Sequence, residues 1–377
     1  MPNIRRLMMG VAAVAGDPEL SGTMWAWGEG SNGQRGSGSN SDMSSPVQIG
    51  ALTTWGATSG KPQWKNTAHA IKQDGTLWGW GYNEQGGQIG DGTVVTKNSP
   101  VQIGSLTTWS RAAGGNYHSI FLSTAGKLYA TGTTFAKGAT GLGNNTNYSS
   151  PVQIGSLTNW AYPAAAQYCS GCVKTDGTLW TWGAGASGQS GRGNILNISS
   201  PEQVGSLTNW SKLVMGPGGS SAAIKTDGTL WTWGSGDSGR LGDGTVVNKS
   251  SPVQVGSLTT WAYVSCGQSH TIAIKTDGTM WGWGKGMSVG YISGSGHTVN
   301  QSSPVQIGTE RDWWRVSCTG ASSSAVAKAG TLWSWGGGSN GVLGNGAVSN
   351  INSPIQIGTD TDWYDVAGGN QTMQALK

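Results

Sequence analysis

The pair Cys169 and Cys172, in the stretch CSGC, has the spacing of a redox or metal-binding motif. Two such thiols can exchange a disulfide or supply half of a zinc site. In an extended strand, residues i and i+3 point to opposite faces and lie roughly 10 Å apart, whereas a disulfide needs α-carbons within about 7 Å. CSGC lies on a predicted strand before an Asp-Gly turn, so both thiols are interpreted as small buried hydrophobes. Cys266 and Cys318, in equivalent stretches, receive the same interpretation.

The histidines and carboxylates also lack a spacing typical of catalysis. His118 and His270 recur in the similar stretches GNYHSI and GQSHTI, and we expect them to hydrogen-bond between strands. Asp91 and Asp243, in GDGT, are interpreted as turn residues. Four further turn aspartates each precede a glycine: Asp74, Asp176, Asp227 and Asp277. No HExxH or Walker-type sequence is present, so we expect a non-enzymatic protein without a metal or other cofactor.

These residues belong to a unit that recurs about every 50 residues along the chain. Its most regular part is TDGTLWTWG (226–234). The final glycines of its seven copies are Gly28, Gly81, Gly132, Gly183, Gly234, Gly284 and Gly336. A segment such as SPVQIG follows each copy, and a tryptophan lies nine residues after each of these prolines. A period of this length, repeated seven times, is the signature of a propeller or a solenoid.

Each unit predicts short β-strands. In HTIAIKTDGTMWGWG (270–284), an Asp-Gly pair joins two apolar runs, which indicates a hairpin with a tight two-residue turn. Trp231 and Trp233 lie on one face of their strand, opposite Leu230. Because bulky side chains lie on both faces of this strand, both faces must be buried. Blades stacked on either side, with the tryptophans in the core, would bury them. Since no helical apolar periodicity is found, the predicted fold class is all-β, a seven-bladed β-propeller.

The two ends of the chain supply complementary halves of one unit. The C-terminal WYDVAGGNQTMQALK matches WAYVSCGQSHTIAIK (261–275) and stops where the Asp-Gly turn would follow. The N-terminal SGTMWAWG supplies the missing half. Pairing of N- and C-terminal strands in one blade would close the ring and remove two free sheet edges. The predicted domains are a seven-repeat propeller over 21–377 and an N-terminal arm or anchor over 1–20.

The repeat pattern carries a family resemblance. The pattern G-x-x-H-[ST]-x-A-I-K-x-D-G-x-L-W-x-W-G, seen in GQSHTIAIKTDGTMWGWG, precedes G-x-L-G-x-G and Ser-Pro, and it resembles the regulator of chromosome condensation repeat family. The resemblance covers residues 21–377 and implies a seven-bladed β-propeller. Nucleotide exchange on a small GTPase belongs to one branch of that family and is not implied. The uniform SPVQIGSLTTW loops also resemble low-divergence repeat proteins of marine bacteria and their phages.

The composition argues against charged ligands. The formal net charge is +4, 11% of the residues are charged, and the longest Lys/Arg run is Arg5-Arg6. Nucleic acid and chromatin need clustered cations against phosphates, so neither is an expected partner. No apolar stretch approaches the roughly 20 residues of a membrane span. A surface rich in Ser, Thr, Asn, Gln and Gly suits sugars or another protein.

Departures from the repeat are where specific recognition is expected, since loops on a rigid scaffold commonly provide it. An insertion in repeat two, GATSGKPQWKN, brings Trp64. The lengthened loop of repeat six brings Tyr291 and His297, and these three residues are the candidate ligand-binding residues. Repeat three carries FAKGATGLGNNTNY and replaces both strand tryptophans by Tyr129 and Thr131. Neutral drift of the loops is the alternative explanation.

The first twenty residues belong to no repeat. Arg5-Arg6, a short apolar stretch and an Ala-Val-Ala before Gly16 fit a secretory signal. The apolar run over 7–15 holds only nine residues, which is short for export, so we favour an arm that docks on a partner. The residues expected to contact that partner are Ile4, Arg5, Arg6, Leu7, Met8 and Met9.

Three functions follow from these observations. The leading hypothesis is a phage virion component of the tail or fibre. It would attach to a host surface glycan or protein through a neutral propeller face, and dock on other virion proteins through its arm. The alternative is a secreted or periplasmic bacterial binding module, which would be cleaved after Ala15. A regulator of a small GTPase or of chromatin is least favoured, because the sequence shows no basic face.

Overall fold

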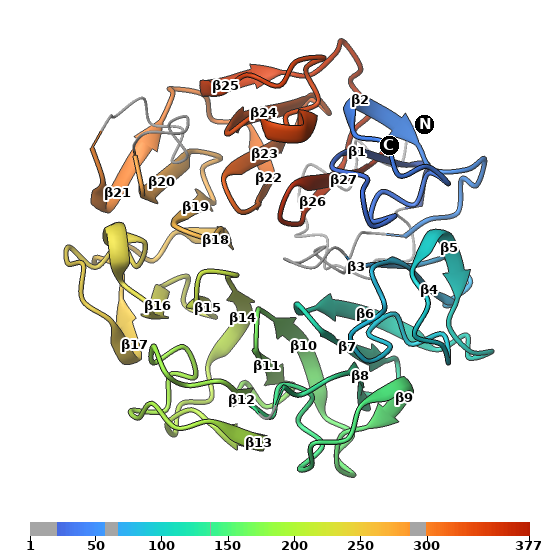
Figure 1. The fold of residues 1–377 in the computed structure, drawn as a ribbon. Helices are drawn as coiled ribbons and strands as arrows, with labels where there is room; N and C mark the ends of the chain where they lie inside the picture. The colour runs from blue at the N-terminus through green and yellow to red at the C-terminus, as the bar shows by residue number, and fades with distance from the viewer. Residues whose placement is uncertain (1–20, 57–66, 136, 287–298) are drawn as a thin grey trace.

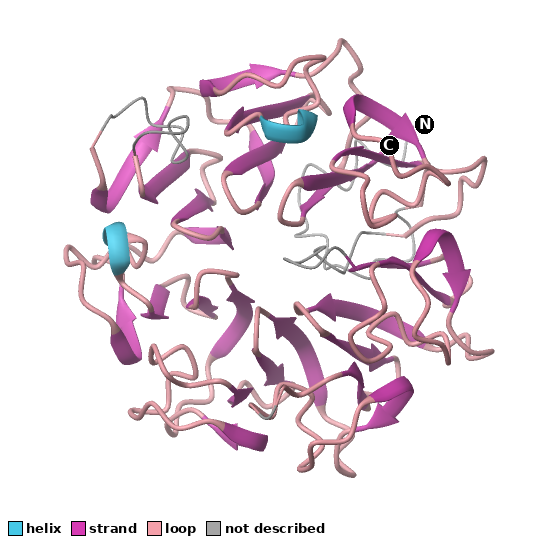
Figure 2. Cartoon of the chain, in the orientation of Figure 1, coloured by secondary structure: helices cyan, strands magenta, loops and turns pink. Residues whose placement is uncertain are grey.

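In the computed structural model the described residues are 21–56, 67–135, 137–286 and 299–377. Their strands form seven antiparallel sheets, arranged as blades around one axis (Figure 1). Six blades have four described strands and one has three. Helix is limited, over the described residues, to two 3-10 turns, η1 (Asp237–Gly239) and η2 (Ser339–Gly341) (Figure 2). The predicted all-β, seven-bladed propeller is confirmed.

Four strand positions repeat from the axis outward. The innermost strands are β6 (Trp109–Gly114), β10 (Trp160–Ala165), β14 (Trp210–Met215), β18 (Trp261–Cys266), β22 (Trp313–Cys318) and β26 (Asp365–Gly368). The second strands are β3 (Thr67–Ile71), β7 (His118–Ser123), β11 (Cys169–Lys174), β15 (Ser220–Lys225), β19 (His270–Lys275), β23 (Ser322–Ala327) and β27 (Thr372–Leu376).

The outer half of each blade carries the most regular sequence. The third strands are β1 (Met24–Gly28), β4 (Leu77–Gly81), β8 (Leu128–Gly132), β12 (Leu179–Gly183), β16 (Leu230–Gly234), β20 (Met280–Gly284) and β24 (Leu332–Gly336). The outermost strands are β2 (Met43–Gln48), β5 (Lys97–Gln102), β9 (Tyr148–Gln153), β13 (Ile198–Gln203), β17 (Lys249–Gln254), β21 (Gln301–Ile307) and β25 (Ile351–Gln356). Each outermost strand contains the Ser-Pro of its repeat, and a proline there removes a donor from an edge that could otherwise pair with another chain.

The first blade is built from both ends of the chain, in the order β2-β1-β27-β26 (Figure 1). β1 pairs antiparallel with β27, from Met24 opposite Leu376 to Gly28 opposite Thr372. The N–H of Thr23 also donates to the carbonyl of Lys377 at 2.8 Å. The predicted closure of the ring by N- and C-terminal strands is therefore confirmed, whereas the predicted arm (1–20) lies outside the described residues.

The Asp-Gly hairpins close with three-residue loops, so the predicted two-residue turn is wrong. In the first copy, the N–H of Lys72 donates to the carbonyl of Thr76 at 3.0 Å. A two-residue type I′ turn requires positive φ at both central residues. Gly75 has φ +78°, but the φ of Asp74 is not positive. The Asp74 carboxylate accepts the N–H and the hydroxyl of Thr76, at 2.9 and 2.6 Å, and so stabilises the longer loop.

The core lies between blades, around the second tryptophan of each third strand. The fully buried members are Trp27, Trp80, Trp182, Trp233, Trp283 and Trp335. The indole N–H of Trp283 donates to the carbonyl of Arg240 in the preceding blade at 2.9 Å. Trp27, Trp80, Trp182 and Trp233 make the equivalent bond. Burial and this bond confirm that these tryptophans are structural.

Repeat three preserves the contact without its tryptophan. The hydroxyl of Thr131 donates to the carbonyl of Gln88 in the preceding blade at 3.0 Å, in place of an indole N–H. The fully buried Phe121 adds aromatic bulk to the same blade interface, with its ring 5.9 Å from that of Trp109 and 4.9 Å from that of His69. The substitution is therefore compensated by a neighbouring strand.

Candidate functional site

The residues of the DGT turn form one structural unit. The Thr76 hydroxyl donates to the Asp74 carboxylate, and the same hydroxyl accepts the indole N–H of Trp78 at 2.9 Å. The Lys72 ammonium lies 3.5 Å from the centre of a Trp78 ring, a cation–π contact. The hydrogen bonds from Thr76 lower the pKa of Asp74. The same set of contacts recurs at Asp176, Asp227 and Asp277.

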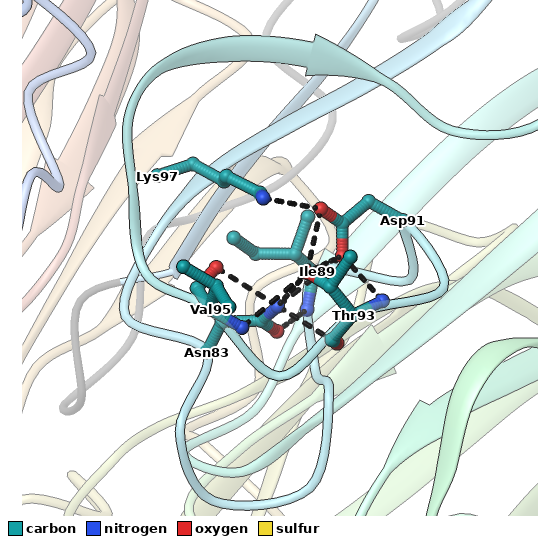
Figure 3. A network of polar contacts seen from close by, with 6 residues as sticks. All are labelled: Asn83, Ile89, Asp91, Thr93, Val95 and Lys97. Carbon is teal, nitrogen blue, oxygen red and sulfur yellow. Dashed lines mark hydrogen bonds and ion pairs between the residues drawn. The ribbon is translucent and has the colours of Figure 1, made fainter.

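The GDGT loops are held by a network of polar contacts, shown for repeat two in Figure 3. The amide of Asn83 donates to the carboxylate of Asp91 at 3.2 Å and to the carbonyl of Thr93 at 3.0 Å. Lys97 pairs with Asp91 at 3.2 Å. Burial would raise the pKa of Asp91, but the bonds from Thr93 and Lys97 bring it below its ordinary value. Its interpretation as a turn residue is confirmed, and these contacts occupy the carboxylate.

The repeat histidines link neighbouring blades. The Ser170 hydroxyl donates its single hydrogen to the carbonyl of Ala139 at 2.9 Å. The same hydroxyl must therefore accept from His118, whose Nε2–H donates to it at 2.7 Å. His270 makes the matching contact with Ser323 at 2.8 Å. Burial lowers the pKa of both histidines to about 3, so they are neutral at ordinary pH. The expected hydrogen bonding is confirmed, and it crosses from one blade to the next.

The cysteines are buried thiols. Cys169 and Cys172 lie on β11 and are fully covered, as are Cys266 and Cys318 on their innermost strands. Burial raises the pKa of both Cys169 and Cys172 to about 12, which removes the thiolate that redox or metal chemistry uses. Over the described residues, no group of three or more His, Cys, Asp or Glu side chains could hold a metal ion.

The predicted site residues all fall outside the described residues. They are the arm residues Ile4, Arg5, Arg6, Leu7, Met8 and Met9, and the loop residues Trp64, Tyr291 and His297. The expectation that they bind a partner or a ligand stays a prediction.

An aromatic cluster that the sequence analysis did not single out lies between blades three and four. It consists of Tyr117 before β7, Phe135 after β8 and Tyr168 before β11. The rings of Tyr117 and Tyr168 are stacked, with centres 6.0 Å apart and planes at 23°. The Phe135 ring lies 4.3 Å from that of Tyr117 and 6.3 Å from that of Tyr168. Three rings from two blades therefore share one patch, which we call the aromatic cluster.

Phe135 occupies this cluster at a conformational cost. Its φ is +43°, a region that bulky residues rarely adopt, and left-handed backbone costs roughly 1–2 kcal/mol. Its side chain remains 42% exposed, so burial does not repay the strain. Strain of this kind at an exposed aromatic residue is characteristic of binding sites.

Polar groups frame the aromatic cluster. The Lys137 ammonium lies 4.1 Å from the centre of the Tyr168 ring, where the negative face of the ring stabilises it. The hydroxyl of Thr134, the residue before Phe135, donates to the amide oxygen of Asn145 at 3.4 Å. The patch thus combines exposed ring surface with amide, hydroxyl and ammonium groups.

A comparison of repeats gives a partial signal for this patch. Tyr117 and Tyr168 occupy the position before the repeat histidine in adjacent repeats, where later repeats have smaller residues: Gly219, Ser269 and Ala321. The loop FAKGATGLGNNTNY was noted as irregular, but the pairing of its phenylalanine with the two tyrosines depends on how the blades stack.

A hollow lies between blades seven and one. It has a volume of about 510 Å³ and is lined by Asp42, Ser44, Ser339, Asn340, Gly341 and Val348. Hydroxyl, amide and one carboxylate group face it without an aromatic surface. Because flat aromatic rings contribute most to recognition energy at such sites, the aromatic cluster is the stronger candidate.

Seven repeat-built blades, closed by both ends of the chain, define the class of protein: a β-propeller made of tandem repeats. The sequence matches the regulator of chromosome condensation (RCC1) repeat at residues 74–122, 176–223, 227–274 and 329–376, and a second form of that repeat at 261–290. The chain belongs to the RCC1 repeat family, as the resemblance implied.

Relatives of different function share the repeat. The ultraviolet-B receptor UVR8 of Arabidopsis thaliana is 30% identical over 345 residues, which are 88% of this chain and 76% of that protein. The human E3 ubiquitin-protein ligase HERC2 is 28% identical over 67% of this chain, but the match spans only 5% of HERC2.

Solved structures show the same fold. Human WBSCR16 superposes with a TM-score of 0.81 at 19% identity, covering 95% of this chain and 99% of its own. Prp20p of Saccharomyces cerevisiae superposes with a TM-score of 0.81, also at 19% identity, covering 100% and 94%. Within the described part of the chain, no helix is long and apolar enough to cross a membrane.

Proposed function

We propose that this chain is a non-enzymatic binding protein that recognises a neutral surface glycan through the aromatic cluster. The observation that carries the proposal is the exposed, strained Phe135 beside two tyrosines. The C–H groups of a sugar ring carry partial positive charge and pack against the negative face of an aromatic ring. The amide of Asn145 and the ammonium of Lys137 can donate to sugar hydroxyls.

A glycan array probed with the fluorescently labelled full chain would test this function. We expect binding to neutral hexose-containing glycans, and weaker binding in Phe135→Ala. Loss of a central aromatic contact removes about 2 kcal/mol of binding free energy, or roughly a thirtyfold rise in Kd, measurable by calorimetry.

Val247→Ala is the matched control, because Val247 lies in the corresponding loop of blade five and is 59% exposed. It should leave the Kd unchanged. The proposal fails if no glycan binds, or if Phe135→Ala and Val247→Ala have the same affinity. A Tyr168→Ala variant should weaken binding in the same direction, since it removes the second ring of the patch.

We further infer that the setting of this recognition is a phage virion, where the protein would belong to the tail or fibre and bind the host surface. The uniform polar loops and the low content of charged residues support this setting. Mass spectrometry of purified particles would test it, and recovery of the chain only from secreted or periplasmic fractions would favour the bacterial binding module instead.

Docking on other virion proteins through residues 1–20 is part of the same proposal. Deletion of residues 2–16 should leave a folded propeller that is not incorporated into particles; unchanged incorporation would contradict the docking role. A protein partner is the second candidate for the propeller face, because the yeast relative of this fold, Prp20p, is described by its binding to Gsp1p and histones. Recovery of a small GTPase in a pull-down that Phe135→Ala does not affect would support that candidate.

A further inference from the structure

The hollow between blades seven and one crosses the seam at which the ring closes. Among the described residues, Asp42 and Ser44 line it from blade one, and Ser339, Asn340 and Val348 line it from blade seven. Figure 1 shows β2 and β25 on neighbouring blades at this seam. The volume of the hollow, about 510 Å³, lies within the range of small-molecule sites.

The two walls of the hollow are fixed by direct contacts between the blades. A Cβ on Gly341 would lie 2.5 Å from the Cα of Ser44, so glycine is required for η2 to approach β2 this closely. The amide nitrogen of Asn340 donates to the side-chain oxygen of Gln371, which precedes β27 in blade one. Because both contacts cross the seam, the shape of the hollow is set before any ligand enters it.

Asp42 carries a charge that its structural role does not need. One of its carboxylate oxygens accepts the N–H of Gly30 at 2.9 Å. In four other repeats a neutral amide oxygen accepts the equivalent glycine N–H, at 2.9 to 3.2 Å: Asn197, Asn248, Asn300 and Asn350. An asparagine would therefore hold the loop equally well, and the second carboxylate oxygen of Asp42 remains free to bind another partner.

No cation of the described chain forms an ion pair with this carboxylate. Arg35 is close enough for its charge to act on Asp42: burial lowers the pKa of Arg35, and Asp42 raises it. The Arg35 side chain is fully buried, however, and donates to the carbonyls of Ser39 and Ser41 instead of to the carboxylate. Asp42 is exposed, so its free oxygen can be reached from solvent.

The polar groups that face the hollow are rich in hydrogen-bond acceptors. Because the amide nitrogen of Asn340 donates to Gln371, its carbonyl oxygen is the part of the amide that is left to accept. The hydroxyls of Ser44 and Ser339 can also accept. A primary ammonium group has three N–H donors and no acceptor, so it complements a set of acceptors that includes a carboxylate. Hydrogen bonds between such charged partners are stronger than neutral ones.

We propose that this hollow binds a small ligand through its primary ammonium group, with Asp42 as the counter-charge. Asn340 and Ser44 supply further acceptors, one from each blade. The volume leaves room for the body of the ligand, and the exposed Val348 offers it an apolar contact. Amino sugars and simple alkylamines share this chemistry, and the experiment separates them. The site is distinct from the aromatic cluster and does not depend on the proposed glycan.

Calorimetric titration of the full chain at about pH 6, where primary amines are protonated, tests the proposal. The probes are glucosamine, N-acetylglucosamine and butylamine at constant ionic strength. We expect one site for glucosamine, and binding of the uncharged N-acetylglucosamine at least about tenfold weaker. Asp42→Asn keeps an oxygen for Gly30 but removes the charge, so it should weaken glucosamine binding between about tenfold and a hundredfold. Asp237→Asn removes the same charge from the corresponding face of blade five, where the side chain is 73% exposed, and should leave the affinity unchanged.

Two results would support the proposal and assign the ligand. Glucosamine binding tighter than butylamine assigns the site to amino sugars, and butylamine binding at least as tightly assigns it to the ammonium group alone. Phe135→Ala should leave the affinity for glucosamine unchanged, which separates this site from the aromatic cluster.

Four results would overturn the proposal: no binding to the folded wild type, N-acetylglucosamine binding as tightly as glucosamine, equal affinity in Asp42→Asn and Asp237→Asn, or loss of binding in Phe135→Ala. Circular dichroism of each variant confirms folding. Ser44→Ala removes one acceptor and should weaken binding by about twofold to tenfold, which keeps the test decisive if Asp42→Asn does not fold.

Discussion

Alanine substitutions at two glycines of one loop distinguish the energetic cost of a steric clash from that of backbone strain. Gly242 and Gly244 both have positive φ, +73° and +84°. A Cβ on Gly242 would lie 2.6 Å from the indole nitrogen of Trp283, whereas one on Gly244 would meet nothing closer than the hydroxyl of Ser303, at 3.9 Å. Alanine at either position carries the same backbone penalty, and only Gly242→Ala disturbs the contact between blades.

The magnitudes follow from those contacts. Alanine in the left-handed region lowers the free energy of unfolding by about 1–2 kcal/mol, which applies to both variants. In Gly242→Ala the Trp283 ring must also move, and its indole N–H loses the carbonyl of Arg240. An unsatisfied buried donor adds about 1–3 kcal/mol. We therefore expect a loss of about 1–2 kcal/mol for Gly244→Ala and about 2–5 kcal/mol for Gly242→Ala.

Urea unfolding, followed by tryptophan fluorescence and circular dichroism, measures this difference. Any stabilisation that alanine brings by restricting the unfolded chain is common to both variants and cancels in the comparison. Equal losses in the two variants would refute the reasoning, because they would mean that the contact between Gly242 and Trp283 contributes nothing to blade packing.

Three further predictions concern ionisable groups. Burial lowers the pKa of Lys212 to about 8 and Arg111 lowers it further, so this pKa should rise in Arg111→Gln, as measured by NMR of the labelled amine; an unchanged value would show that Arg111 does not act on Lys212. Hydrogen bonds from Thr229 lower the pKa of Asp227, so its stabilisation is complete above pH 3.8 and is lost as the pH falls below that value. Asp227→Asn should therefore flatten the acid limb of a plot of urea midpoint against pH. Because burial raises the pKa of Cys172 to about 12, native protein should resist a thiol reagent at pH 8, and all four cysteines should react only in urea.

The repeat pattern was sufficient to predict the architecture. Seven in-register copies predict seven blades, and the split between SGTMWAWG and the C-terminal stretch predicts closure, because both are properties of order along the chain. The burial of Trp233 and the hydrogen bonding of His270 also follow from their fixed places in the unit, whereas the structure shows that the His270 bond crosses to the next blade. The turn at Asp74 was predicted one residue too short, since its length depends on a side-chain bond to Thr76.

The binding surfaces were harder to predict, because they depend on contacts between units. The aromatic cluster joins Phe135 with Tyr168, which is in the next repeat, and no local pattern relates them. Arg111 and Lys212 share an offset from a repeat tryptophan that the sequence displays, but the register shift between each of them and that tryptophan is a property of the backbone. Recognition in this fold is thus determined by stacking, which a single repeat cannot reveal.

Closure of the first blade links the fold to the order in which the chain is made. On the ribosome, β1 emerges well before its partner β27, because the bonded residues Thr23 and Lys377 are 354 positions apart. Throughout synthesis β1 keeps an unpaired edge, which is open to misassembly or to chaperones. A product truncated before β26 can never cover that edge. Completion of the ring therefore depends on the synthesis of β26 and β27.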